Sequence, residues 1–173
     1  PSRQHYFQKC ITWSDISGRN FAARYCDYGF VFDVKGSSGF PDEENIYFVL
    51  ALLNSCITPK FIDTLNPTLT TQVGDLKRIP VINTNKKIKD KIDLLSKENV
   101  EISKNDWDDF ELSWDFKNNP LLRYKNECKT LLEAFSKWKK FKETQFLKLK
   151  ENEEEINRIF IDLYGLVDEL IPK

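Results

Sequence analysis

The residue composition changes at about residue 83, and this change limits the folds open to the chain. Residues 1–40 are rich in aromatic and β-branched residues punctuated by glycines, a pattern typical of short strands joined by turns. Beyond Thr84, lysine, glutamate and leucine dominate, as in helices. We therefore predict an α+β fold, in which a small mixed lobe at residues 1–82 is followed by a mainly helical part at residues 83–173.

Hydrophobic periodicity predicts the elements of the first part. A strand is predicted at residues 29–34, because apolar side chains alternate there with period two. A helix is predicted behind the acidic residues 42–44, whose charge suits a helix N-terminus. Four apolar residues follow its helical spacing: Ile46, Val49, Leu50 and Leu53. Residues 54–55 and Pro59 are expected to close this helix, and residues 61–82 to return to turns and extended backbone.

The second part carries two helical patterns. One lies around residues 88–95, and the longest lies at residues 125–155. Residues 106–116 between them combine aromatic and acidic side chains and are expected to form a short helix or a structured loop. The long helix needs a partner to cover its apolar stripe. Either a further helix at residues 156–164 or an antiparallel return onto residues 88–95 could supply it.

Charge and cysteine content exclude several classes of protein. Formal net charge is -1, and residues 1–82 hold eight basic against eight acidic residues, so any nucleic-acid contact must rest on a local patch. The four cysteines form no C-x-x-C pair and there is one histidine, which favours free thiols in a reducing cytoplasm over a zinc site. The sequence shows no signal peptide and no apolar run long enough for a membrane span. We expect a soluble, cytoplasmic protein without membrane partners.

The chain contains no methionine and opens on Pro1, so we expect it to be an excised piece of a longer protein. No nucleophile elbow, dinucleotide-binding loop or phosphate-binding loop is present. Acidic pairs such as Asp108-Asp109 are more often solvated charge than acid–base machinery. We therefore expect no catalytic residue and no metal site in this chain.

Two groups of polar and basic residues are candidates for DNA contact. The first falls in or beside glycine-containing turns, and the second lies on backbone that is expected to be extended. Ordinary polar loops and an exposed strand face are the alternative interpretations. The first group is Arg19, Arg24, Lys35 and Ser37, and the second is Thr70, Gln72, Lys77 and Arg78.

Motifs along nearly the whole chain carry a resemblance to a known family. The motifs are residues 12–40, 50–55, 66–68, 75–81, 106–116 and 157–166. Together they resemble the region downstream of the catalytic domain in the PglX family, the adenine-specific DNA methyltransferases of BREX phage-defence systems. The helix ending at residues 52–55, followed by a turn and the pair Ile79-Pro80, is also similar to target-recognition domains of type I and type IIG restriction-modification proteins.

The resemblance implies a parent enzyme that transfers a methyl group from S-adenosylmethionine to the N6 atom of an adenine flipped out of the duplex. The family's catalytic Asn-Pro-Pro-aromatic motif is absent, because residues 66–68 and 119–121 lack its second proline and its aromatic residue. The glycine motif for the cofactor is absent too. We therefore expect no cofactor in this chain, and S-adenosylmethionine in the parent enzyme.

These expectations assign the chain to DNA target recognition or positioning, with residues 1–82 as a target-recognition-like lobe and residues 83–173 as a helical spacer. The expected partners are double-stranded DNA, the catalytic methyltransferase domain of the same parent chain and other defence-system proteins. The alternative is a protein-docking helical module that binds another defence component, which the neutral charge favours. Strong salt dependence of binding would favour DNA, since phosphate contacts release counterions.

Overall fold

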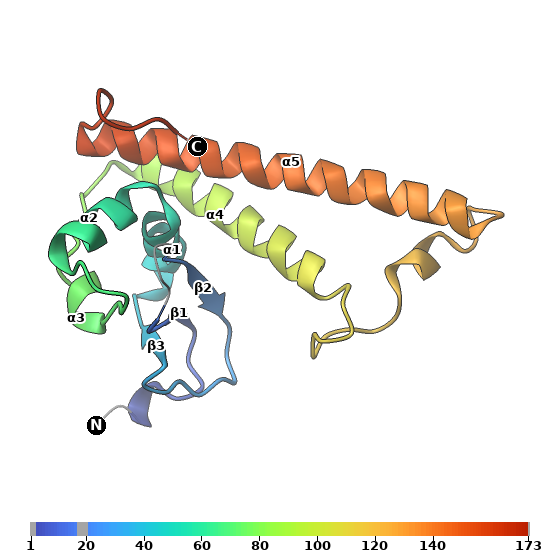
Figure 1. The fold of residues 1–173 in the computed structure, drawn as a ribbon, viewed down its shortest axis with the longest axis horizontal. Helices are drawn as coiled ribbons and strands as arrows, with labels where there is room; N and C mark the ends of the chain where they lie inside the picture. The colour runs from blue at the N-terminus through green and yellow to red at the C-terminus, as the bar shows by residue number, and fades with distance from the viewer. Residues whose placement is uncertain (1–2, 17–20, 173) are drawn as a thin grey trace. The chain divides into compact units, whose positions relative to one another are not determined.

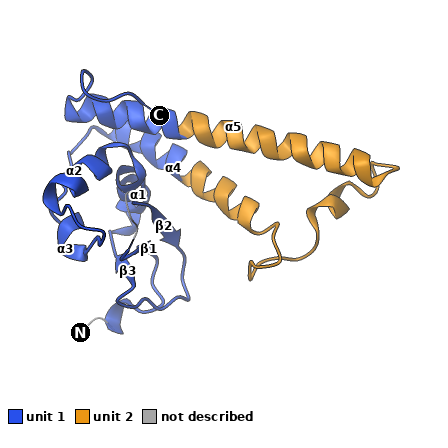
Figure 2. Ribbon diagram, in the orientation of Figure 1, with its two compact units in different colours: residues 1–96, 153–173 blue, residues 97–152 orange. Residues whose placement is uncertain are grey.

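The computed structural model describes residues 3–16 and 21–172, and its α+β architecture confirms the predicted fold class (Figure 1). The chain forms two compact units (Figure 2). Unit 1 consists of residues 1–96 and 153–173, and unit 2 of residues 97–152. The boundaries between these units, at residues 96–97 and 152–153, differ from the boundary at residue 82 that the sequence suggested. The recognition and spacer roles assigned to residues 1–82 and 83–173 stay predictions.

The sheet of unit 1 is small and antiparallel within the described residues. β1 (Cys10–Ser14) lies in the middle, between β2 (Ala23–Cys26) and β3 (Gly36–Gly39). Thr12 lies opposite Arg24 on β2 and opposite Ser38 on β3, so these three residues share one face of the sheet. Neighbouring residues of a strand point to opposite faces. The buried side chains of Ile11 and Trp13 therefore project to the other face.

The strand predicted at residues 29–34 is wrong, since this segment is an irregular loop. Gly29 has a φ of 100°, a conformation that favours glycine and that breaks an extended strand. The carboxylate of Asp33 accepts hydrogen bonds from the N–H groups of Lys35, at 2.8 Å, and Gly36, at 2.6 Å. These local bonds turn the chain into β3, and an aspartate in this role favours a turn over a sheet ladder.

The predicted first helix and its end at residues 54–55 are confirmed. Pro59 does not close it but lies in a further helix, so residues 61–65 are helical and not extended as expected. The short 3-10 helix η2 (Glu43–Asn45) leads into α1 (Ile46–Asn54), and α2 (Ile57–Leu65) follows almost at once. Pro59 lies in the first turn of α2, where a missing N–H removes no helical hydrogen bond. The hydroxyl groups of Ser55 and Thr58 each donate to the Leu52 carbonyl at 2.7 Å and complete the end of α1.

α1 is apolar on nearly all sides because it is the central helix of the unit 1 core. Among the described residues no single helix is long and apolar enough to cross a membrane. The helical segments Glu43–Asn54 and Ile57–Leu65 reach the required length and apolar character only when they are taken together, and the chain bends by 73° between them. Most residues of α1 are buried against the sheet and the neighbouring helices. These are Ile46, Phe48, Leu50, Ala51, Leu52 and Leu53.

The predicted helices of the second part are confirmed, with different ends. α4 (Lys86–Trp107) contains residues 88–95, and α5 (Leu131–Tyr164) continues past residue 155 as one helix. Short helical turns form η1 (Arg3–His5), α3 (Val73–Leu76) and η3 (Pro120–Tyr124). In unit 1, Lys91 of α4 makes an ion pair with Glu155 of α5. In unit 2, the side-chain amide of Asn152 donates to Glu98 at 2.8 Å, so α4 supplies a partner for α5.

The last turns of α5 belong to the core of unit 1. Phe160 is 1% exposed and meets the ring of Phe48 edge to face, with 5.5 Å between the ring centroids. The side-chain oxygen of Asn157 accepts a hydrogen bond from the N–H of Cys56 at 2.9 Å. These contacts join residues about one hundred positions apart in the chain. They explain why residues 153–173 group with the N-terminal part.

Asn54 pairs with the edge strand β2 in the way that a further strand would. Its side-chain oxygen accepts from the N–H of Ala23 at 2.8 Å, and its NH₂ group donates to the Ala23 carbonyl at 2.9 Å. Replacing Asn54 by alanine is expected to lower the free energy of unfolding by about 1–2 kcal/mol, because two backbone groups lose their partners. Chemical denaturation measures this change.

Thr64→Ala is the control for this prediction. Thr64 lies exposed on α2 and its hydroxyl donates to the Lys60 carbonyl of the same helix, so we expect a change within about 0.5 kcal/mol. Equal stabilities of the two variants would show that Asn54 does not hold the sheet edge.

Candidate nucleic-acid interface

The structure places the predicted DNA-contact residues in unit 1, except Arg19, which lies outside the described residues. Arg24 and Ser37 lie on the sheet, and Lys35 lies immediately before β3. The remaining candidates lie at and around α3: Thr70, Gln72, Lys77 and Arg78. Thr70 and Gln72 have the extended backbone that the sequence suggested, since Thr70 forms a β-bridge and Gln72 precedes α3 with a ψ of 160°. Lys77 and Arg78 instead lie in the turn that follows α3.

The end of β1 brings members of the two groups together. The N–H of Asp15 donates to the Lys35 carbonyl at 3.0 Å, and the N–H of Thr71 donates to the Asp15 carbonyl at 2.8 Å. Ile16 forms an isolated antiparallel bridge with Thr70. Lys35 and Thr70, which are 35 positions apart in the chain, thus flank the same short stretch of backbone.

Asp15 is a residue of this region that sequence reasoning missed. The ammonium group of Lys35 lies 2.9 Å from its carboxylate, and the Lys35 side chain stays 73% exposed. The acid offsets part of the lysine charge and holds it near the end of β1, while the exposed stem leaves the lysine free to reach a ligand. Asp15 stands between Ser14 and Ile16 in the resemblance motif, and its acidic side chain there was the available signal.

The turn around α3 is held by its own backbone groups and by the side chains of Asn66 and Asp75. The Asp75 carboxylate accepts from the N–H of Gln72 at 2.9 Å and from the side chain of Asn66 at 2.7 Å. The N–H of Arg78 donates to the Asp75 carbonyl at 3.1 Å. The side chains of Gln72, Lys77 and Arg78 are exposed, and α3 packs beside β3. A ligand could therefore meet them without unfolding the turn.

Arg24 and Ser37 do not meet on one surface. Ser37 lies opposite the buried Trp13, and its hydroxyl makes only a long hydrogen bond of 3.5 Å to the Val34 carbonyl. Arg24 lies opposite Thr12 and is exposed on the other face. The candidates thus form a surface at the end of β1 and around α3, with Arg24 apart from it.

The face of the sheet that carries Arg24 is partly covered by the loop that was predicted to be a strand. The loop residues Phe30, Val31 and Phe32 line a pocket of about 350 Å³ together with strand residues, among them Cys10 and Cys26. Burial, with the neighbouring Cys10 thiol, raises the pKa of Cys26 to about 11. At neutral pH this thiol is therefore protonated and is a poor nucleophile.

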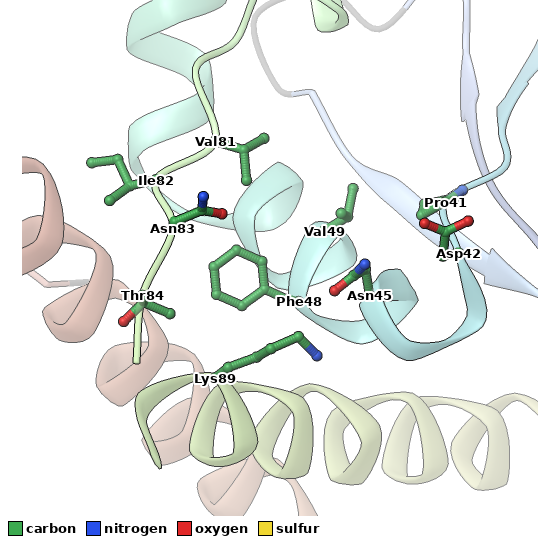
Figure 3. Close-up of a pocket in the computed structure, with 10 residues that line it drawn as sticks. All are labelled: Pro41, Asp42, Asn45, Phe48, Val49, Val81, Ile82, Asn83, Thr84 and Lys89. Atoms are coloured by element: carbon green, nitrogen blue, oxygen red, sulfur yellow. The ribbon is translucent and has the colours of Figure 1, made fainter. Parts of the chain in front are cut away.

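A second pocket, of about 310 Å³, lies between the start of α1 and residues 81–84 (Figure 3). Phe48 forms part of its wall, and the side-chain amides of Asn45 and Asn83 line it. The hydroxyl of Thr84 is buried without a hydrogen-bond partner among the described residues. None of the predicted DNA-contact residues lines this pocket.

The described residues do not fit a methyl-transfer site. Their strands are all antiparallel, whereas nucleotide cofactors are held where a parallel strand turns through a glycine-rich loop into a helix. No group of three or more histidine, cysteine, aspartate or glutamate side chains in the described part of the chain could hold a metal ion. We assign no step of methyl transfer to this chain.

Unit 2 contains a buried acidic cluster that sequence reasoning treated as solvated charge. The Asp109 side chain is 1% exposed, with the ammonium group of Lys142 at 2.7 Å and the guanidinium of Arg123 also bound to it. The indole N–H of Trp138 lies 3.5 Å from the same carboxylate. Burial alone would raise the pKa of Asp109, but Lys142 and Arg123 hold it below its usual value. A carboxylate bound in this way is structural and is not a general base.

Two curated relatives match nearly the whole chain, and both are adenine-specific methyltransferases. The first is the adenine-specific methyltransferase PglX of Lacticaseibacillus casei (strain Zhang), which is 42% identical over 171 residues, 96% of this chain and 14% of that protein. The second is the adenine-specific methyltransferase BrxX of Escherichia coli O9:H4 (strain HS), which is 34% identical over 167 residues, 95% of this chain and 13% of that protein. No family model matches the chain.

These relatives confirm the predicted resemblance: the chain matches a region of BREX-type adenine-specific methyltransferases. It spans 13% to 14% of their length. The similarity to target-recognition domains of restriction-modification proteins is not tested by them and stays a prediction. The candidate DNA-contact residues likewise stay predictions.

Proposed function

We propose that this chain is the DNA target-recognition or positioning segment of a site-specific adenine-N6 DNA methyltransferase in a phage-defence system. The observation that carries the proposal is the match of nearly the whole chain to adenine-specific methyltransferases. The methyltransferase motif is absent from the chain, so its part in that enzyme is other than the chemistry. Holding the enzyme on its DNA site is the role that the exposed polar surface of unit 1 suits best.

The surface at the end of β1 and around α3 supports this role. Lys35, Lys77 and Arg78 supply cations for phosphates, and Thr70 and Gln72 supply donors and acceptors for base edges. A short helix with flanking turns can enter a groove while the buried helix α1 holds the sheet behind it. Ser37 and the distant Arg24 complete the candidate set, together with Arg19.

The proposal extends to the parent enzyme. Its catalytic domain would bind S-adenosylmethionine, flip the target adenine and methylate its N6 atom, while this chain sets the position on double-stranded DNA. Other defence-system proteins are further partners, and the cytoplasm, where the DNA lies, is the proposed location.

DNA binding with its salt dependence tests the proposal. Fluorescence anisotropy of a host-derived duplex with the purified chain should show affinity that falls steeply as salt rises, because bound phosphates release counterions. The proposal would be contradicted if the chain did not bind DNA even at low salt and the full-length enzyme with this surface altered still bound DNA as tightly as the unaltered enzyme.

Charge reversal identifies the contact residues. Arg24→Glu and Arg78→Glu are each expected to weaken DNA binding about tenfold and to reduce the salt slope by about one. Lys60→Glu is the matched control, because Lys60 is exposed on α2 and is outside the candidate set. If Lys60→Glu weakened binding as much as Arg78→Glu, the effect would be net charge and not a defined surface.

The second candidate function is a protein-docking module that binds another defence component. The net charge of -1 and the exposed apolar side chains of unit 2 favour it. Binding to a protein partner that is insensitive to salt, with no DNA binding, would select this function over the first.

A further inference from the structure

The pocket between the start of α1 and residues 81–84 has both polar and apolar walls, and the residues that line it all belong to unit 1. Figure 3 shows the side-chain amides of Asn45 and Asn83 on either side of the Phe48 ring. Val49 and Val81 add aliphatic surface. The volume of about 310 Å³ is at the lower end of the range for small-ligand sites, roughly 300–1,000 Å³. A pocket of this size suits a single ring system better than a long chain.

The two side-chain amides of the pocket have no hydrogen-bond partner in the described part of the chain. Asn45 is the N-cap residue of α1, but its side chain makes no capping hydrogen bond. The side chain of Asn83 likewise pairs with no other described residue. Each amide offers two donor hydrogens and an acceptor oxygen. A ligand with donors and acceptors along its edges would therefore use groups that the fold leaves open.

Charge at the pocket disfavours an anionic ligand. Lys89 is among the lining residues, but its ammonium group donates to the Glu44 carbonyl and pairs with the Asp93 carboxylate at 2.7 Å. The exposed carboxylate of Asp42 also lines the pocket and forms no ion pair with another described residue. A phosphate or carboxylate would meet this acid while the lysine is already bound. The pocket therefore favours a neutral ligand.

A purine base has the chemistry that these walls require. Its flat faces pack against apolar side chains, and an asparagine amide can form two hydrogen bonds to the N6 and N7 atoms of adenine. The Asp42 carboxylate can accept a hydrogen bond from a sugar hydroxyl. The pocket also lies close in the chain to the candidate DNA surface. Arg78 is three residues before Val81, a span of at most about 11 Å of backbone.

We propose that this pocket binds a neutral purine base, which is supplied either by a free nucleoside or by an unpaired nucleotide of DNA. The base packs against Phe48 and the two valines, and Asn45 and Asn83 pair with its edges. The inference goes beyond the proposed function, because binding of the base needs none of the candidate DNA-contact residues. Only the DNA source of the base rests on the proposed function.

Titration of the chain with adenosine, followed by NMR, tests the proposal. Adenosine should shift the backbone amide signals of residues 45–49 and 81–84, with a dissociation constant on the order of 0.1 mM. The analogue 7-deazaadenosine, which lacks the N7 atom, should bind about tenfold more weakly. Adenosine monophosphate should bind no more tightly than adenosine. The proposal is overturned if millimolar adenosine shifts none of these signals, or if the monophosphate binds more tightly.

An asparagine variant ties the binding to the pocket. Asn83→Ala should weaken adenosine binding about tenfold, because the amide that pairs with the base is removed. Asn105→Ala is the matched control, since Asn105 is exposed on α4 and lies outside the pocket. The circular dichroism melting curve should be unchanged in both variants, because both side chains are exposed. Equal adenosine binding by the two variants would overturn the proposal.

A duplex with one unpaired adenine distinguishes the two sources of the base. Binding at least about fivefold tighter than to the fully paired duplex, with the difference lost in Asn83→Ala, would identify DNA as the source. Equal binding of the two duplexes, with adenosine still bound, would identify the free nucleoside. Arg78→Glu should weaken duplex binding and leave adenosine binding unchanged. Failure of the proposed DNA contacts would thus be distinguishable from failure of the base pocket.

Discussion

Replacing Asp109 by alanine is expected to destabilise unit 2 by about 3 kcal/mol. The substitution removes the buried partner of the Lys142 ammonium group, which is 18% exposed, and leaves it the pair with Asp106, whose side chain is 59% exposed. It also releases Arg123 of η3 and the indole of Trp138 of α5, which hold the loop after α4 to these two helices. Hydrogen exchange of residues 97–152 measures the effect locally and should become roughly a hundredfold faster.

Asp115→Ala is the control for this result. Asp115 also pairs with a lysine, at 2.5 Å from Lys104, but its side chain is 67% exposed, so its loss should cost less than about 1 kcal/mol. If both variants changed hydrogen exchange equally, burial of Asp109 would not be the cause.

The pH dependence of unit 2 stability gives a second check on Asp109. The lowered pKa of Asp109 means that its stabilising contribution is complete above the unfolded-state value of about 3.9. The contribution is lost as the pH falls through the lower pKa of the folded state. The difference in stability between the wild-type chain and Asp109→Ala should therefore be constant near neutrality and shrink in acid.

Replacing Phe160 by alanine is expected to lower the free energy of unfolding of unit 1 by about 3–5 kcal/mol. The ring is 1% exposed and packs against Phe48 of α1, so its removal leaves a cavity in the core. Chemical denaturation, followed by hydrogen exchange of α1, measures the loss. The result also tests whether residues 153–173 are part of unit 1 or of a separate helical spacer.

Phe146→Ala is the matched control for this core substitution. Phe146 lies on the same helix, α5, but is 65% exposed, so its replacement should change stability by no more than about 0.5 kcal/mol. A near-neutral Phe160→Ala would mean that the end of α5 does not pack on the N-terminal part, and the spacer division at residue 82 would then be favoured.

Only part of the candidate surface could be predicted from the local sequence pattern. Exposed basic and polar residues could be identified because they stand beside glycine and in turn motifs, as Lys35 and Arg78 do. Their neighbours in space could not, because the contact of Asp15 with Lys35 and the bridge of Ile16 with Thr70 depend on how distant segments pair. The strand predicted at residues 29–34 failed for a local reason instead. Its apolar residues alternate with period two, but Gly29 and the carboxylate of Asp33 favour a loop.

The sequence by itself determined the α+β class, the existence of α1, α4 and α5, and the relation to adenine-specific methyltransferases, because helical periodicity and motif residues are local properties of the chain. Only the tertiary structure decided that the end of α5 completes unit 1, that the Asp109 carboxylate is buried and that Trp107, Phe110 and Leu112 are exposed. The reason is physical. Burial of a side chain is decided by residues that pack on it from far along the chain, as the hydrogen bond between Cys56 and Asn157 illustrates.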